Sequence, residues 1–217
     1  HSDAFHVTNS SVIPGKQVAC FVLGRKIEIE APVFGSGGGA TNAAATFGHL
    51  GLKAASLCKI GTDDLAQDVI RDLEHHGVYT HAMVRDHKTP TGYSVLLTAE
   101  GGERTAIVYR GASAHLKAAD LPNRFDAAWV YLTSVGGSLP LVKAIFSKAN
   151  AAQAHVAWNP GAPELHHGLR ALSSFMENTD VLFLNRDEAV ALTRASRGDT
   201  RGILRTLGRL VKEWFVL

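Results

Sequence analysis

The order of apolar and polar residues changes character about halfway along the chain. In the second half, short apolar runs predict buried strands at 128–132, 155–158 and 181–184. The segments between and after these runs predict helices over 139–149, 164–174, 186–193 and 200–212. Strands that alternate with helices in this way indicate an α/β architecture, in which a parallel sheet is covered on both faces.

The first half of the chain mixes two kinds of pattern. Strands are predicted at 4–7, 17–23, 26–30, 53–60 and 78–84. Helices are predicted over 39–50 and from an N-cap at Thr62 or Asp63 to a stop at Gly77. Two long runs, 92–98 and 104–109, flank a glycine-containing turn and predict a hairpin. We expect the runs at 17–30 and 92–109 to pair into a small sheet apart from the main one.

The stretch from Gly35 to Thr46 carries the clearest candidate chemistry. Four of its first five residues are glycine, and a helix-favouring run follows at once. Glycine lets a ligand approach the backbone closely, and the start of a helix offers free N–H groups and a positive dipole end. Asn42, about one turn into the helix, can both donate and accept hydrogen bonds. The alternative is a tight strand-to-helix turn that holds no ligand.

Other polar residues are expected beside this stretch. Ligands of open α/β sheets bind at the carboxyl ends of the strands. The glycine stretch, the segment Asn159-Pro160-Gly161 and Asn185 all fall at such strand ends in the predicted order of elements. We therefore expect them at one edge of the sheet.

Composition narrows the functional classes. Apolar residues make up 46% of the 217 residues and charged residues 19%, which is typical of a globular protein. The formal net charge of +2 gives no electrostatic case for a nucleic-acid or membrane partner. Cys20 and Cys58 make no disulfide framework, so we expect two buried thiols in a reducing compartment, with the cytoplasm as the default.

Both ends of the sequence are unusual for a folded domain. The chain opens at His1 without a starting Met and closes at Leu217 on an apolar run that predicts a strand. A globular chain rarely stops inside a core strand, because that leaves an uncovered edge. We therefore expect the sequence to be a piece of a longer protein, truncated at both ends.

Two rival sites can be weighed from the sequence. The eleven histidines, including His75-His76 and His166-His167, lack metal-binding spacing and an accompanying cysteine cluster, so surface histidines are expected and no direct metal ligand. The pattern Gly35-x-Gly37-x-x-Ala40 imitates a dinucleotide-binding fingerprint. However, the run before it is short and contains proline, and no acidic strand end follows about 20 residues later.

A set of short motifs occurs in an order that spans nearly the whole chain. The motifs are Gly37–Ala44, Leu50-Gly51, Lys59–Asp63, Thr91-Gly92, Gly102–Thr105, Gly111-Ala112, Asn159-Pro160 and Asn185–Glu188. In these motifs and in their order, the chain resembles the ribokinase-like (PfkB) carbohydrate kinases. The first motifs are similar to the family's first signature of paired glycines, an Asn and a strand ending in Gly-x-Asp, and the last fits its Asn-x-x-Glu.

The resemblance implies a three-layer α/β/α fold with a mostly parallel central sheet and a small β-sheet lid. It implies one partial domain over 1–217, with lid strands at about 12–30 and 90–110. The implied activity is ATP-dependent phosphorylation of a sugar or nucleoside hydroxyl. ATP, Mg²⁺ and, in the full-length protein, a monovalent cation are the implied cofactors, and the resemblance allows a homodimer through the lid.

The resemblance also assigns roles to particular residues. Asp3, Gly38, Gly39 and Asn42 match the sugar-binding positions, and Arg104 in the predicted hairpin is a further substrate-binding candidate. Asn185 and Glu188 match the motif that helps to place Mg²⁺ and phosphate. The alternatives are solvated surface roles for Asp3 and Arg104, and for Glu188 a favourable charge in the first turn of a helix.

One departure from the family pattern affects the activity. The second signature, Asp-Thr-x-Gly-Ala-Gly-Asp, is absent from the sequence. In the family, its last Asp is the base that accepts the hydroxyl proton, and its glycines form the anion hole for the transferred phosphoryl group. We therefore expect no catalytic residue in this stretch, the base lying beyond Leu217, and no turnover by residues 1–217 alone. A catalytically silent sugar-binding or dimerising protein is the alternative.

Overall fold

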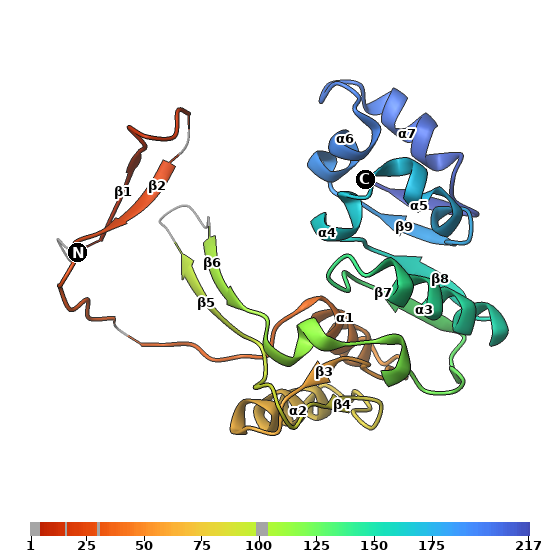
Figure 1. Cartoon of the computed structure of the whole chain (residues 1–217), viewed down its shortest axis with the longest axis horizontal. Coiled ribbons are helices and arrows are strands. Elements are labelled where there is room, and N and C mark those ends of the chain that lie inside the picture. The colour runs from red at the N-terminus through yellow and green to blue at the C-terminus, as the bar shows by residue number, and fades with distance from the viewer. Residues whose placement is uncertain (1–4, 16, 30, 99–103) are drawn as a thin grey trace. The chain divides into compact units, whose positions relative to one another are not determined.

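The computed structural model describes residues 5–15, 17–29, 31–98 and 104–217. The chain forms two compact units, and Figure 1 labels most of their helices and strands. The first unit comprises the residues up to Gly35 together with Ser94–Tyr109, and the second comprises Ser36–Tyr93 and Arg110–Leu217. The glycine-rich stretch from Ser36 onward and all of the parallel strands therefore belong to the second unit.

The first unit is built from two separate two-stranded sheets. Strand β1 (Phe5–Asn9) pairs antiparallel with β2 (Gln17–Phe21), and β5 (Tyr93–Thr98) pairs with β6 (Arg104–Tyr109). We expected the run at 17–30 to pair with the run at 92–109, and for the residues described this is wrong. Strand β2 of the first run pairs with β1, and the two strands of the second run pair with each other. The expected strand at 26–30 is also wrong over its described residues 26–29, which lack strand structure despite their alternating pattern.

The second unit contains the predicted parallel sheet. Its strands are β7 (Trp129–Leu132), β8 (His155–Trp158), β9 (Val181–Phe183) and β10 (Trp214–Val216). Their order is β10-β9-β8-β7, and every neighbouring pair is parallel. Because all four strands run the same way, the residues that follow them meet at one edge of the sheet, and those that precede them meet at the other.

Helices cover both faces of this sheet. On one face, the fully buried ring of Trp158 contacts Phe146 of α3 (Leu139–Ala151) and Phe175 of α5 (Gly168–Met176), at centroid distances of 5.6 and 6.2 Å. Successive side chains of a strand point to opposite faces, so Tyr131 of β7 lies on the other face from its neighbour Leu132. There Tyr131 packs edge-on against Phe47 of α1 (Gly39–His49), at 5.7 Å. The expected α/β/α layering is therefore present.

The residues before β7 add a shorter βαβ unit. Strand β3 (Lys59–Ile60) pairs in parallel with β4 (Val84–Arg85), and α2 (Asp64–His75) connects them. The strands expected at 53–60 and 78–84 are thus shorter than predicted, although an isolated bridge between Ala55 and Tyr79 continues the pairing. Two short 3₁₀ helices, η1 (Gly111–His115) and η2 (Ala118–Asp120), lead from this unit to β7.

Several helix boundaries differ from the prediction. The helix expected over 164–174 is divided into α4 (Ala162–Leu165) and α5, because Gly168 adopts a φ of 77° that interrupts the helix. The helix expected over 200–212 ends four residues earlier, as α7 (Thr200–Gly208), whereas α6 (Arg186–Thr193) matches its predicted bounds.

Two further properties concern the chain as a whole. Cys20 is exposed, contrary to the expected burial, and Cys58 is half-buried; both are free thiols. Burial raises the pKa of the Cys58 thiol. Among the helices of the described residues, none has the length and apolar character needed to cross a membrane.

Candidate functional site

The glycine loop, residues Ser36 to Gly39, leads directly into helix α1. Gly38 is the N-cap and has a φ of 110°, a conformation that suits glycine. No side chain caps this helix, whereas the side chain of Asp63 caps the start of α2. The backbone N–H groups of the first turn lack partners within a helix, so this turn can donate hydrogen bonds to a polar ligand.

Side chains just inside α1 stabilise the loop and extend its polar surface. The hydroxyl of Thr41 is buried and donates to the carbonyl oxygens of Gly37 and Gly38, at 2.7 and 3.0 Å. The amide N–H of Asn42 donates to Gly38 O at 2.9 Å, while the Asn42 residue is exposed. The structure therefore places Gly38, Gly39 and Asn42 at one exposed helix start, from the N-cap to the fourth helical residue.

Gly39 fixes where the loop lies relative to the sheet. A Cβ atom at this position would lie 2.2 Å from the hydroxyl oxygen of Thr133, the residue that follows β7. At the other end of the loop, the Ser36 hydroxyl donates to the carboxylate of Asp72 in α2. The loop is thus held between α2 and the carboxyl end of β7, which is where the sequence predicted it.

The loops after β8 and β9 reach the same edge. Asn159 follows β8, and its side-chain amide donates to the carbonyl oxygen of Phe183 at the end of β9, at 2.9 Å. Asn185 lies two residues beyond Phe183 and begins helix α6. The four-stranded sheet thus carries the glycine loop, Asn159 and Asn185 at its carboxyl edge.

Asn185 and Glu188 form a capping box at the start of α6. The side-chain oxygen of Asn185 accepts from the Glu188 N–H at 2.9 Å, and Glu188 Oε2 accepts from the Asn185 N–H at 2.9 Å. The structure therefore brings these two predicted residues together and gives each a structural role. Their role near Mg²⁺ and phosphate stays a prediction, for which the amide group of Asn185 and the second carboxylate oxygen of Glu188 are the available groups.

Sequence reasoning missed Glu164, which is fully buried behind this edge. Its Oε1 accepts from the N–H groups of Val135 and Gly137, at 2.9 and 2.7 Å, and its Oε2 accepts from the N–H of Gly161, at 2.9 Å. One carboxylate thus joins the loop after β7 to the loop after β8. The available signal was the position of Glu164, three residues after Gly161 at a helix start that contains Pro163.

A second polar cluster lies at the carboxyl end of β3. Asp63 is the N-cap of α2 and accepts from the Ala66 N–H at 3.0 Å, as predicted, but it also binds Thr91. The Thr91 hydroxyl donates to Asp63 Oδ1 at 2.6 Å, and the Thr91 N–H donates to Oδ2 at 2.7 Å. The Thr91 hydroxyl in turn accepts from the Gly61 N–H at 3.0 Å. The pKa of Asp63 lies below its usual range, chiefly because of the hydrogen bond from the Thr91 hydroxyl.

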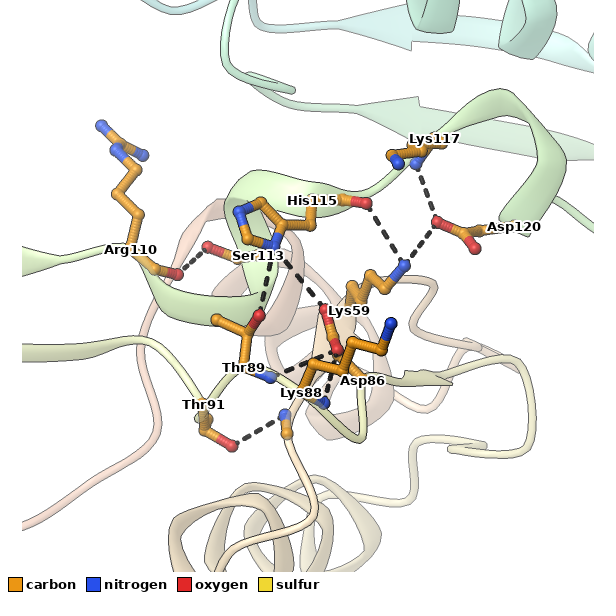
Figure 2. Close-up of polar contacts among 11 residues, drawn as sticks. Lys59, Asp86, Lys88, Thr89, Thr91, Arg110, Ser113, His115, Lys117 and Asp120 are labelled. Carbon is orange, nitrogen blue, oxygen red and sulfur yellow. Dashed lines mark hydrogen bonds and ion pairs between the residues drawn. The ribbon is translucent and has the colours of Figure 1, made fainter.

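Figure 2 shows how this cluster continues along β3. Lys59 Nζ donates to Asp120 Oδ2 at 2.9 Å and to the carbonyl oxygen of His115 at 3.2 Å, and Lys59 lowers the pKa of Asp120. Asp86 accepts from the N–H groups of Lys88 and Thr89, and its Oδ2 lies 3.6 Å from His115 Nδ1. These bonds hold the segments on either side of the β5–β6 pair against β3.

Two predicted residues remain outside this arrangement. Asp3 lies outside the described residues. Arg104 is exposed on β6, in the first unit, whereas the glycine loop belongs to the second. Their substrate-binding roles stay predictions.

Comparisons with solved structures show the fold. An adenosine kinase from Sinorhizobium meliloti superposes with a TM-score of 0.70 at 24% identity, covering 92% of this chain and 59% of that one. A probable sugar kinase from Rhizobium etli CFN 42 gives a TM-score of 0.68 at 26% identity, covering 80% and 55% respectively. The chain therefore has a ribokinase-like α/β fold, as the sequence predicted.

Comparisons of sequence extend the likeness beyond the fold. A ribokinase from Staphylococcus aureus (strain COL) is 26% identical over 171 residues, which cover 77% of this chain and 54% of that protein. A mouse ribokinase is 29% identical over 87 residues, which cover 40% of this chain and 27% of that protein. The chain thus spans at most about half the length of these two relatives. The model of the pfkB family carbohydrate kinases matches residues 16–216, so the chain belongs to this family.

Proposed function

We propose that this protein is an ATP-dependent kinase that phosphorylates a hydroxyl group of a sugar or nucleoside, and that residues 1–217 supply its substrate-binding part. One observation carries the proposal: the uncapped, glycine-rich start of α1 lies against the carboxyl end of β7, beside the loops that follow β8 and β9. Ligands of open parallel sheets bind at this edge. Membership of a carbohydrate kinase family and the likeness to ribokinases support the same class of substrate.

The chemistry of the loop suits a polyhydroxylated ligand. A sugar presents neighbouring hydroxyl groups, each of which can donate and accept. The exposed amide of Asn42 offers one acceptor and two donor hydrogens, and the first turn of α1 offers backbone donors. In the proposal, Asp3 adds a carboxylate that accepts from two hydroxyls, and Gly38 leaves room for the ring beside the backbone.

The cofactor part of the proposal concerns Asn185 and Glu188. Magnesium prefers oxygen ligands and keeps several of its waters, so an amide and a carboxylate at the carboxyl edge fit it through water. In the capping box, Glu188 uses Oε2 for the Asn185 N–H, which leaves Oε1 for a magnesium-bound water. When bound, Mg²⁺ neutralises the charge of the ATP phosphates. The residues of this chain would orient it rather than transfer a proton.

Binding and turnover separate the proposal from its alternative. Because the sequence contains no match to the family's second signature, we expect residues 1–217 to bind a sugar or nucleoside without transferring phosphate at a kinase's ordinary rate. Calorimetric titration with ribose, fructose and adenosine, together with an ATP-turnover assay, tests both parts. Asn42→Ala should weaken binding about tenfold, which corresponds to about 1.4 kcal/mol. His49→Ala, exposed at the other end of α1, is the matched control.

The outcomes are distinct. Binding that is weakened by Asn42→Ala and unchanged by His49→Ala supports the site. If neither variant changes the affinity for the sugar or nucleoside, the substrate binds elsewhere. Turnover by residues 1–217 at the rate of a complete kinase would refute the proposal that these residues bind the substrate without transferring phosphate. If a longer form of the protein also binds sugar but does not turn over ATP, the protein is the silent binding protein of the alternative.

The proposal extends to a homodimer through the first unit. Apolar side chains are widely exposed there, with exposed fractions of 86% for Val12, 95% for Leu23, 56% for Leu96 and 60% for Ile107. Exposed apolar groups of this extent favour association with another protein surface. Light scattering of the purified protein is the test, and a monomer at high micromolar concentration would contradict the proposal.

A further inference from the structure

Three potential metal ligands meet at the amino edge of the parallel sheet, opposite the candidate substrate site. His155 is the first residue of β8, Asp180 directly precedes β9, and Glu213 directly precedes β10. These strands are neighbours in the order β10-β9-β8 and all run in parallel. One ligand atom from each of the three side chains lies within 4.8 Å of the other two.

The central ligand is rigidly placed. Asp180 is only 4% exposed, and its Oδ2 accepts from the N–H of Val156 at 2.7 Å. This bond leaves Oδ1 directed toward His155, whose Nδ1 lies 3.2 Å away. Burial by itself would raise the pKa of Asp180, but the hydrogen bonds from Val156 and His155 and the charge of Lys212 outweigh it and lower the pKa. Asp180 therefore offers Oδ1 as a metal ligand at a fixed position.

The two outer ligands are accessible from solvent. The ring of Trp129, the first residue of β7, stacks on the ring of His155, with centroids 4.7 Å apart and an interplanar angle of 26°. Stacking fixes the plane of the imidazole while its nitrogen atoms remain at the ring edge. Glu213 is exposed, so its longer side chain can turn toward the other two. The arrangement combines one fixed acceptor with two ligands that solvent and ions can reach.

We propose that His155, Asp180 and Glu213 bind a zinc ion. An imidazole nitrogen with two carboxylate oxygens is a set that zinc accepts, whereas magnesium and calcium favour oxygen ligands alone. Zinc–ligand distances of about 2.0–2.2 Å require ligand atoms roughly 3.3–3.6 Å apart in a tetrahedron. His155 Nδ1 and Asp180 Oδ1, 3.2 Å apart, are already close to this spacing. Rotation of the exposed Glu213 side chain brings the third ligand into place, and water completes the fourth position.

Lys212 competes with the ion for Asp180. Its Nζ lies 3.8 Å from Asp180 Oδ1, and its side chain is 47% exposed. A zinc ion bound to Oδ1 would repel this ammonium group, which can move into solvent. Removal of the charge by Lys212→Ala should therefore tighten zinc binding, which distinguishes a metal site from a simple cluster of ion pairs.

A bound ion would join the amino ends of three adjacent strands. Since the unfolded chain does not hold these ligands together, zinc that binds the folded state preferentially raises its stability by mass action. We expect one zinc ion per chain by calorimetric titration and a higher midpoint of thermal unfolding at saturating zinc. Co²⁺ provides a second readout, since its visible absorption reports tetrahedral coordination.

The variants are chosen to leave the fold intact. His155→Gln and Glu213→Gln change exposed side chains and should each weaken zinc binding at least tenfold. His81→Gln removes another exposed histidine, away from the cluster, and should leave binding unchanged. Magnesium at the same concentration should give no comparable shift of the unfolding midpoint.

The proposal fails if the wild-type chain shows no saturable zinc binding. It also fails if zinc binding survives both His155→Gln and Glu213→Gln at wild-type affinity, because the ion then occupies other residues. Circular dichroism of each variant separates loss of the site from loss of the fold. None of these measurements depends on sugar binding or phosphate transfer.

Discussion

The carboxylate of Asp63 binds both the hydroxyl and the backbone N–H of Thr91, at 2.6 and 2.7 Å, while it caps helix α2. Thr91 directly precedes the segment that leads into β5, and Gly111 begins the segment that returns from β6. A Cβ on Gly111 would lie 2.4 Å from the carbonyl oxygen of Pro90, and the Ala112 N–H donates to that same oxygen at 2.8 Å. The segment that leads into β5 and the segment that follows β6 are thus fixed to each other near the start of α2.

Loss of the Thr91 hydroxyl should destabilise the second unit. Thr91→Val keeps the volume of the buried side chain but leaves the Gly61 N–H without its acceptor and Asp63 with one bond fewer. Such a loss costs about 1–3 kcal/mol in the free energy of unfolding, measured by urea denaturation. Thr98→Val, at an exposed position of β5, is the control and should change stability little. Equal stability of both variants would contradict this role.

The bond to Thr91 also predicts a pH dependence. The pKa of Asp63 is lowered from its ordinary value near 3.8, chiefly by the Thr91 hydroxyl. As the pH falls, the unfolded chain binds the proton first, so the stabilisation is complete above the unfolded pKa and is lost as the pH falls through the folded pKa. The difference in unfolding free energy between wild type and Asp63→Asn should therefore be constant from about pH 7 to 5 and shrink below it.

A neighbouring carboxylate provides the control for this pH dependence. Asp64, the first residue of α2, is exposed, and Asp64→Asn should produce a much smaller change. Acid unfolding followed at several pH values measures both variants. If the wild-type advantage over Asp63→Asn stays constant down to pH 2, the lowered pKa of Asp63 is wrong.

The sequence predicted the parallel strands well because their signal is local. The run 155–158 has three apolar residues after His155, lies between helical patterns and becomes β8 with the predicted bounds. Alternation alone was misleading at 26–30, since a strand also requires a partner and residues 26–29 have none in the structure. The run at 53–60 failed in part for the same reason, as only Lys59 and Ile60 find a continuous ladder with β4.

The site could be predicted only where its residues are neighbours in sequence. The glycine loop and the Asn185–Glu188 capping box are local, so their motifs were visible. Glu164 binds N–H groups of a loop 27 to 29 residues away, and the sequence gives no direct sign of that contact. The same holds for the approach of Gly39 to Thr133, which depends on how α1 packs against β7.

Glu164 should be far more important for stability than an ordinary surface glutamate. Glu164→Gln replaces one carboxylate oxygen by an NH₂ group, which then faces the N–H of Gly161 or those of Val135 and Gly137. Hydrogen bonds to charged groups are worth about 1.5–3 kcal/mol each, so we expect a loss of that order in the free energy of unfolding. Glu177→Gln, exposed after α5, is the control.

Hydrogen exchange gives a local test of the same role. In Glu164→Gln the amides of the loops after β7 and β8 should exchange faster, while those of α2 should not. Unchanged protection at Val135 and Gly137, together with wild-type stability, would show that other contacts hold these loops.

The last prediction concerns the reason for glycine at position 39. A sugar ring against the backbone would exclude a side chain there, but the chain itself already does so, since a Cβ would lie 2.2 Å from Thr133 Oγ1 and 3.0 Å from Thr133 Cβ. Gly39→Ala should therefore destabilise the protein by about 1–3 kcal/mol through overpacking, before any ligand is added. Gly37→Ala is the control, because nothing lies within 4 Å of a Cβ at that position.

A double-mutant cycle distinguishes this steric conflict from a general effect on the loop. Thr133→Ala removes the nearest atom, so the double variant Gly39→Ala with Thr133→Ala should be destabilised by less than the sum of the two single changes, with a coupling of about 1 kcal/mol. Additive changes in urea denaturation would mean that the helix start does not rest on Thr133. If coupling is present, restored sugar affinity in the double variant indicates that the placement of α1 determines binding. If the double variant still fails to bind sugar, the methyl group of Ala at position 39 itself excludes the sugar ring.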